Sequence, residues 1–115
     1  MRKFAANRIG IDQGETEVFS EFKEGGPMWT GSGPRERRCT VKFSESFLDP
    51  PAVQASVTLW DVDSTRNLRA QTTAEDVTRN GCTLVVRTWS DSRIARLRMG
   101  WMAIGPVRSD EDWDV

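Results

Sequence analysis

The sequence predicts an all-β domain arranged as a six-stranded antiparallel β-sandwich. Several short segments alternate apolar and polar residues with a period of two, which is typical of strands with one buried face. Gly, Pro, Asn and Asp cluster between these segments, as expected for turns. No long stretch carries the apolar stripe of an amphipathic helix. A chain of 115 residues has the size of one domain, so we expect a single core.

The expected strands are short segments in which apolar residues occupy one face. In chain order they cover residues 18–22, 41–43, 53–59, 68–72, 84–89 and 93–104. The last carries the clearest pattern, because Arg96 and Arg98 share one parity and apolar residues fill the other. The apolar residues that we expect in the core are Ala95, Leu97, Met99, Trp101 and Ala103. The first and fourth segments carry the weakest pattern.

Residues of known turn chemistry separate these segments. Asn80-Gly81 is the strongest hairpin signal in the chain, because both residue types tolerate a positive φ. Residues 74–77 have room for one short helical turn. We divide the chain into an N-terminal arm (1–9), the sandwich (10–105) and an acidic C-terminal tail (106–115).

The distribution of charge excludes one class of partner. The formal net charge is −1, but four of the 17 acidic residues lie at positions 110, 111, 112 and 114. The rest of the chain has 16 basic and 13 acidic residues, a net charge of +3. General nucleic-acid binding needs a stronger basic stripe, so we expect no nucleic-acid partner. The tail is expected to be a solvated end; the alternative is that Trp113 anchors it on a basic protein partner.

The N-terminal residues do not form a Sec-type signal peptide. A basic start is followed by residues 4–12, where Asn7, Arg8 and Asp12 interrupt any apolar run. No segment approaches the roughly 20 apolar residues of a membrane span. We therefore expect synthesis in the cytoplasm and no membrane insertion. Export by an unconventional route, or carriage on a particle or cell surface, remains open.

Few residues are available for catalysis or for metal binding. The chain has no His and no Tyr, so the commonest general base is absent. Asp61 and Asp63 form a carboxylate pair, but alternate positions in a turn more often cap backbone amides than share a proton. Cys39 and Cys82 lack metal-ligand spacing, and we expect free thiols. We expect no enzyme activity, no catalytic residue, no metal and no cofactor.

The five tryptophans favour a binding function. Trp29 lies in a Gly/Pro-rich loop, Trp89 at a strand end and Trp113 in the acidic tail, where no core requires them. An indole face can pack against the C–H groups of a sugar while nearby polar side chains bond its hydroxyls. We expect Trp89 to contact a ligand and Trp101 to lie in the core.

The even positions of the last strand are unusually apolar for a solvent face. After Arg96 and Arg98 they continue with Gly100, Met102 and Ile104. This combination is typical of a surface that contacts another subunit, where guanidinium groups can pair with carboxylates. The alternative is an amphipathic strand end without a partner.

Three stretches together resemble the H-type lectin domain, the module of snail agglutinins and of the C-terminal part of slime-mould discoidins. They are Gly26–Arg35 with the strand that ends at Phe43, Pro50–Arg69 with Leu59-Trp-Asp-Val-Asp63 at its centre, and Arg87–Ile104. Their order and spacing cover roughly residues 10–105, which makes the combined match specific. The resemblance implies a six-stranded antiparallel sandwich that forms symmetric trimers, sometimes paired into hexamers. Sugar sites then lie in clefts between subunits.

The resemblance also implies which residues contact the sugar. By position, Arg69 matches the arginine that hydrogen-bonds the sugar, and Trp89 matches the aromatic residue of the same cleft. The Thr30–Gly33 loop matches the segment that supplies backbone contacts and an acidic acceptor for a hydroxyl. Gly31 and Gly33 therefore belong to the implied site, on either side of the acceptor position.

Three further positions of the implied site depart from the family pattern. Ser32 stands at the position of the acidic acceptor, Ser90 where the snail protein has a histidine, and Ala95 where it has a tyrosine. The family prefers N-acetylgalactosamine or galactose. These departures open the site to a related sugar, including an acidic one that Arg69 or Arg35 would answer.

The sequence thus predicts a lectin that binds glycans through intersubunit clefts of a multivalent homo-oligomer, a trimer or a hexamer, in a role such as cell adhesion. The alternative is a structural, adaptor or particle-attachment protein that uses the lectin sandwich for protein contacts.

Overall fold

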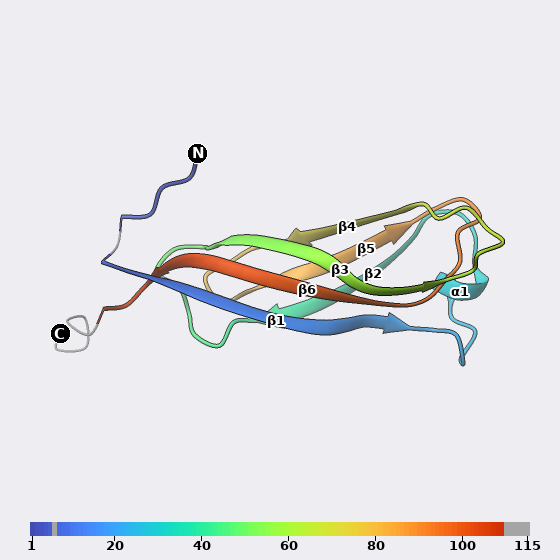
Figure 1. The fold of residues 1–115 in the computed structure, drawn as a ribbon, viewed down its shortest axis with the longest axis horizontal. Helices are drawn as coiled ribbons and strands as arrows, with labels where there is room; N and C mark the ends of the chain where they lie inside the picture. The colour runs from blue at the N-terminus through green and yellow to red at the C-terminus, as the bar shows by residue number, and fades with distance from the viewer. Residues whose placement is uncertain (6, 110–115) are drawn as a thin grey trace.

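The computed structural model describes residues 1–5 and 7–109 and confirms the six-stranded antiparallel sandwich (Figure 1). One sheet has the strand order β1-β6-β3 and the other the order β2-β5-β4; we name them the β6 sheet and the β5 sheet after their central strands. The elements are β1 (Arg8–Ser20), α1 (Pro27–Thr30), β2 (Arg35–Lys42), β3 (Ala52–Val62), β4 (Ala70–Glu75), β5 (Gly81–Thr88) and β6 (Ile94–Val107).

Most connections cross from one sheet to the other, and only β4 and β5 are neighbours in both sequence and sheet among the described strands. As a result, the loops sort to two ends of the sandwich (Figure 1). Residues 21–34, 63–69 and 89–93 lie at the end that carries α1, which we call the α1 end. Residues 43–51 and 76–80 lie at the opposite end, where β1 begins and β6 ends.

The core lies between the sheets and follows the predicted alternation. On β6, Ala95, Leu97, Met99 and Ala103 are buried, and Trp101 packs half-buried against the core. The facing strand β5 buries its residues of even number. The buried apolar cluster comprises Phe19, Met28, Val41, Phe43, Phe47, Cys82, Leu84, Val86, Ile94, Leu97, Met99 and Ala103. Cys39 and Cys82 are free thiols, as expected.

β1 is much longer than the expected segment 18–22. It covers 13 residues, and its first half pairs with the end of β6. The sequence signal is weak here because the residues that face the core are small or polar. Gly14 is one of them: a Cβ at this position would lie 2.9 Å from the indole ring of Trp101. The missing side chain leaves room for that tryptophan.

The turn between β4 and β5 is a hairpin, but its conformation differs from the expected one. The helical turn expected at 74–77 is wrong, because Glu75 remains in the sheet, paired with Thr83. The positive φ falls on Asp76 (51°) and not on Asn80 or Gly81.

Within residues 1–5 and 7–109, no helix is long and apolar enough to cross a membrane.

Candidate functional site

Three loops that carry the predicted site residues meet at the α1 end. The loop after α1 contains Gly31 and Gly33, and the backbone N–H of Gly33 donates to the carbonyl of Ser90 over 2.9 Å. Ser90 lies in the loop after β5. The third loop precedes β4, and its Arg69 carbonyl accepts a 2.6 Å hydrogen bond from the hydroxyl of Thr88. The structure therefore brings these segments, far apart in sequence, to one place.

Ser92 fixes the backbone of Arg69, a role that the sequence reasoning missed. The Ser92 hydroxyl is fully buried, accepts the N–H of Arg69 at 2.7 Å and donates to the carbonyl of Asn67 at 2.6 Å. A serine in a turn-rich stretch gives no signal of such a contact, because its partner lies more than 20 residues away and is set by the fold.

A hollow of about 510 Å³ opens at this end on the outer face of the β5 sheet. Its lining residues are Pro34, Arg35, Glu36, Gln71, Arg87, Thr88 and Trp89. The Trp89 side chain is large and apolar, yet the residue is 42% exposed. Gln71 and Arg87 were not predicted, although Gln71 lies two residues after Arg69 and Arg87 lies two residues before Trp89. Residues two apart in an extended chain share a face, so this spacing could have identified them.

Arg35 lines this hollow but directs its donors into the protein. Its Nε donates to the Gly33 carbonyl at 2.9 Å, and its two terminal nitrogens donate to the carbonyls of Pro27 (3.1 Å), Met28 (3.4 Å) and Ser90 (3.3 Å). Burial, and then the positive charge of Arg93, lower the pKa of Arg35, which still stays protonated at neutral pH. The carbonyl oxygens compensate this charge. Arg35 is therefore poorly placed to answer an acidic sugar.

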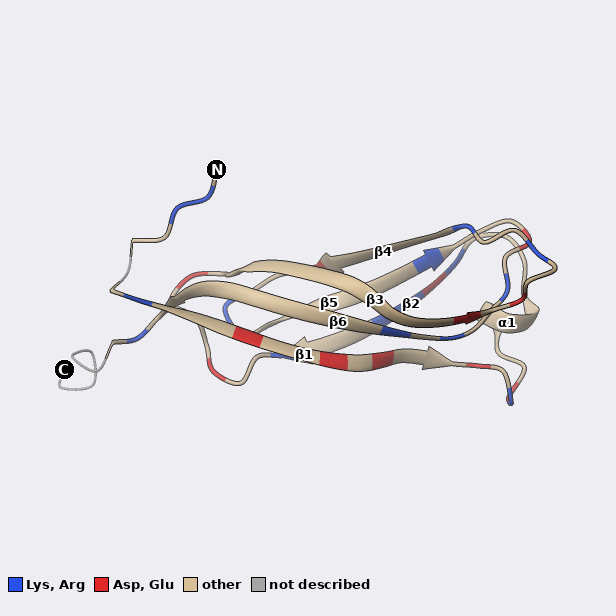
Figure 2. Ribbon diagram, in the orientation of Figure 1, with Lys and Arg blue, Asp and Glu red and all other residues tan. Residues whose placement is uncertain are grey.

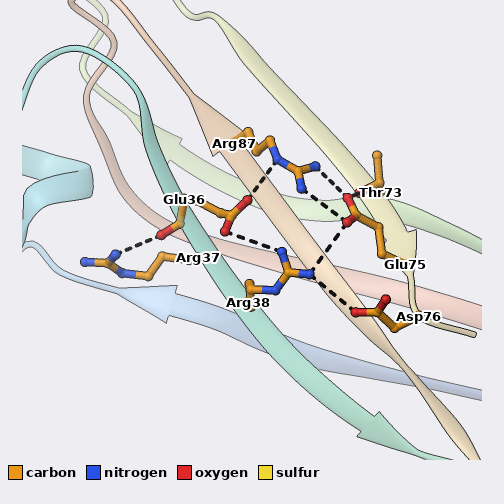
Figure 3. A network of polar contacts seen from close by, with 7 residues as sticks. All are labelled: Glu36, Arg37, Arg38, Thr73, Glu75, Asp76 and Arg87. Atoms are coloured by element: carbon orange, nitrogen blue, oxygen red, sulfur yellow. Dashed lines mark hydrogen bonds and ion pairs between the residues drawn. The ribbon is translucent and has the colours of Figure 1, made fainter.

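Ion pairs occupy the sheet face beside the hollow (Figure 3). The Arg87 guanidinium contacts Glu36 Oε1 at 2.9 Å through Nε and bonds both carboxylate oxygens of Glu75. Arg38 joins Glu36 and Asp76, each at 3.4 Å. Beneath these long side chains, the outward-facing Val85 of β5 is fully buried. The charges that border the hollow are therefore matched within the chain.

Glu75 makes this network sensitive to acid. Hydrogen bonds from Arg87 and from Thr73 lower the pKa of Glu75 from its ordinary 4.5 to about 2. A depressed carboxyl pKa contributes stability that is fully present above the ordinary value and is lost as the pH falls through the folded-state value. We expect the melting temperatures of wild type and Glu75→Gln to differ most near neutral pH and to converge as the pH falls toward about 2.

The matched control is Glu24→Gln, an exposed glutamate in the loop after β1. Its melting curve should follow that of wild type at every pH. A Glu75→Gln difference that stays constant between pH 6 and 2 would show that the carboxylate does not contribute through its ionisation.

The remaining predicted positions differ in their surroundings. Ser32 is exposed, and Ser90 adopts a left-handed φ of 61°, a conformation that is costly for a residue with a Cβ and concentrates at functional sites. Ala95 is only 3% exposed and lies on the core side of β6, where its carbonyl accepts the N–H of Glu21 at 2.7 Å. Trp113 lies outside the described residues.

The structure also shows the surroundings of Trp29 and Asp63, two residues singled out in the sequence. Trp29 is half-buried and packs against the exposed Phe22, with ring centroids 5.2 Å apart. Asp63 caps its own turn, because its Oδ1 accepts bonds from the N–H (2.9 Å) and hydroxyl (2.6 Å) of Thr65. These bonds lower the pKa of Asp63. The Asp63 carboxylate thus has the capping role expected for a turn residue.

The chain is similar to known proteins in sequence and in fold. A family model described as the H-type lectin domain matches residues 38–104. The protein named "ATP synthase subunits region ORF 7" of Fuscovulum blasticum is 49% identical over 107 residues, which are 93% of each chain.

Two structures of discoidin II from Dictyostelium discoideum have the same fold, with TM-scores of 0.75 and 0.74 at 21% identity. They match 91% and 90% of this chain, which spans only 40% and 39% of the discoidin II chain. The family match and the sandwich agree with the resemblance seen in the sequence. The chain belongs to the H-type lectin domain family.

Proposed function

We propose that the chain is a lectin that binds glycans and does not act as an enzyme. The observation that carries this proposal is the half-exposed ring of Trp89 in a hollow at the meeting point of the site loops. The Gln71 amide in the lining can bond hydroxyls, while Arg35 and Arg87 are held by acceptors of the chain itself. An apolar ring beside fixed polar groups suits a sugar, which has C–H faces and hydroxyl edges.

The family and the local charges favour one class of sugar. A galactose or N-acetylgalactosamine type is the first expectation. An acidic relative would have to be answered by Arg69, since the guanidinium of Arg35 donates to backbone carbonyls and that of Arg87 to carboxylates.

A glycan array screened with the labelled wild-type chain tests this proposal. Selective binding that is lost in Arg69→Ala supports the site. Arg66→Ala is the matched control, because it removes an exposed arginine from the same loop. Binding that survives in Arg69→Ala would remove the arginine from the site. If folded wild type binds no glycan, the alternative of an adaptor or particle-attachment protein moves to first place.

We also propose that the chain acts as a homo-oligomer through the outer face of the β6 sheet. Ile11 is 65% exposed there and pairs with Ile104, while Met102 is 38% exposed on the same face. Glu15 on β1 accepts a 2.7 Å bond from Arg98 on β6. Figure 2 shows acidic positions along β1 and basic positions on β6. A hollow of about 610 Å³ over Gly100 could receive a side chain of a second copy. Such a face is typical of subunit contacts, and repeated weak sites raise avidity by roughly 10² to 10⁴.

Replacing Ile11 with glutamate should convert the oligomer to a monomer at micromolar concentration. The buried charge would lack a partner and would oppose association. Light scattering after gel filtration should then give the chain mass of 13.0 kDa. Thr40→Glu adds the same charge to the outer face of the β5 sheet and should leave the assembly intact. A monomeric wild-type protein would rule out the interface and the intersubunit clefts that the resemblance implies, but not the hollow beside Trp89, which one chain forms alone.

A further inference from the structure

We propose that Arg35 is the positioning residue of the hollow beside Trp89. It ties residues 27–33 to the loop 89–93 and thereby holds Trp89 in its binding orientation. This inference rests on the proposed lectin function for its ligand. It goes beyond that function because it assigns a role to a side chain that lines the hollow without offering its donors to it.

The Arg35 side chain joins two chain segments, residues 27–33 and the loop 89–93, to the start of β2. The Arg35 guanidinium donates to the carbonyl of Pro27, the first residue of α1, and to that of Gly33 in the loop after α1. It also donates to the carbonyl of Ser90, the residue after Trp89. The Gly33 N–H donates to the same Ser90 carbonyl. A planar fork that makes several bonds at once fixes orientation as well as distance.

The space around Gly31 also indicates that the loop packs closely against the Arg35 side chain. A Cβ at Gly31 would lie 2.6 Å from the carbonyl of Pro27 and 3.1 Å from Cδ of Arg35. The loop therefore approaches the arginine stem as closely as a glycine permits. The left-handed φ of Ser90 is held between these contacts, since its carbonyl accepts both Arg35 and Gly33.

A lysine at position 35 could not make the same set of hydrogen bonds as the Arg35 guanidinium. Its ammonium is a single point donor on a flexible stem and cannot reach carbonyls on opposite sides at the same time. Arg35→Lys keeps the charge and most of the stem, so it isolates the loss of the fork. Arg38→Lys is the matched control, because Arg38 lies on the same strand but faces the ion-pair network.

The experiment combines amide hydrogen exchange with sugar affinity. In Arg35→Lys we expect exchange of the Gly33 amide to accelerate by about tenfold or more, because charge-assisted bonds that hold its acceptor are lost. Exchange at Leu84 and Val86, in the middle of the β5 sheet, should not change. The dissociation constant for the preferred array sugar should rise by about tenfold. Arg38→Lys should change none of these values.

Each contrary outcome has a defined meaning. Unchanged exchange at Gly33 would overturn the proposal, and so would acceleration that extends equally to Leu84, which would indicate general destabilisation. Faster exchange at Gly33 with unaltered sugar affinity would also overturn it, because the pocket would not depend on the loop. Wild type is screened first, so absence of glycan binding at that step is a failure of the proposed function and is distinct from a failure at Arg35.

Discussion

Sugar binding should fall by about 30-fold or more when Trp89 is replaced with alanine, which corresponds to roughly 2 kcal/mol. The substitution removes the apolar wall of the hollow, against which the C–H face of a sugar would pack. The residue is already 42% exposed, so the fold should survive with a small decrease in melting temperature. Titration calorimetry with the preferred array sugar measures the effect.

Trp60→Ala is the matched control for this prediction. Trp60 is 54% exposed and lies on β3, in the other sheet. The Trp60→Ala variant should bind the sugar with the same affinity as wild type. Equal losses in the two variants would indicate that exposed tryptophans act through something other than the pocket, and an unaffected Trp89→Ala would move the site elsewhere.

Gly81→Ala is expected to destabilise the chain by about 3 kcal/mol or more, which lowers the melting temperature by roughly 10 °C. A Cβ at Gly81 would lie 2.1 Å from the carbonyl oxygen of Val41 on β2. That contact is with backbone, so relief requires β2 and β5 to separate where Gly81 pairs with Lys42. Thermal unfolding followed by circular dichroism measures the change.

Gly100→Ala separates this effect from a general intolerance of alanine at strand glycines. Because Gly100 lies in the proposed interface, the two variants are compared in the Ile11→Glu background. Its Cβ would meet the methyl group of Thr58 at 3.1 Å, and a side chain can yield where backbone cannot. We expect a change of less than about 1 kcal/mol. If both variants unfold alike, the close approach at Gly81 is not the cause.

The sequence predicted the architecture because period-two alternation reports one buried face directly. It underestimated β1, whose inward positions include Gly14 and Thr16, because a strand that faces a large neighbour such as Trp101 needs little apolar volume of its own. Residue type alone predicts the hairpin turn at Asn80-Gly81, where both residues tolerate a positive φ. In the structure, pairing of Glu75 with Thr83 ends the ladder at Asp76, and the chain turns there.

The candidate site was predictable where it depended on residue type and not where it depended on loop contacts. An isolated tryptophan at a strand end predicted Trp89, which lines the hollow. Arg69, which the family resemblance implied, lies in the loop before β4 and is not among the residues that line the hollow. The roles of Arg35 and Ser92 depend on backbone carbonyls and amides that face them across three loops. No spacing in the sequence encodes such partners, because they exist only after the sheets have packed.

The direction of the strands determines how the domain can be displayed. Arg8 pairs with Val107 at the end opposite α1, so the first and the last strand place both chain termini of the sandwich on the same side (Figure 1). The 14 residues of β6 separate that side from the pocket by roughly 40 Å. A carrier joined at either chain terminus would therefore lie on the side opposite the hollow and would leave Trp89 accessible to a ligand.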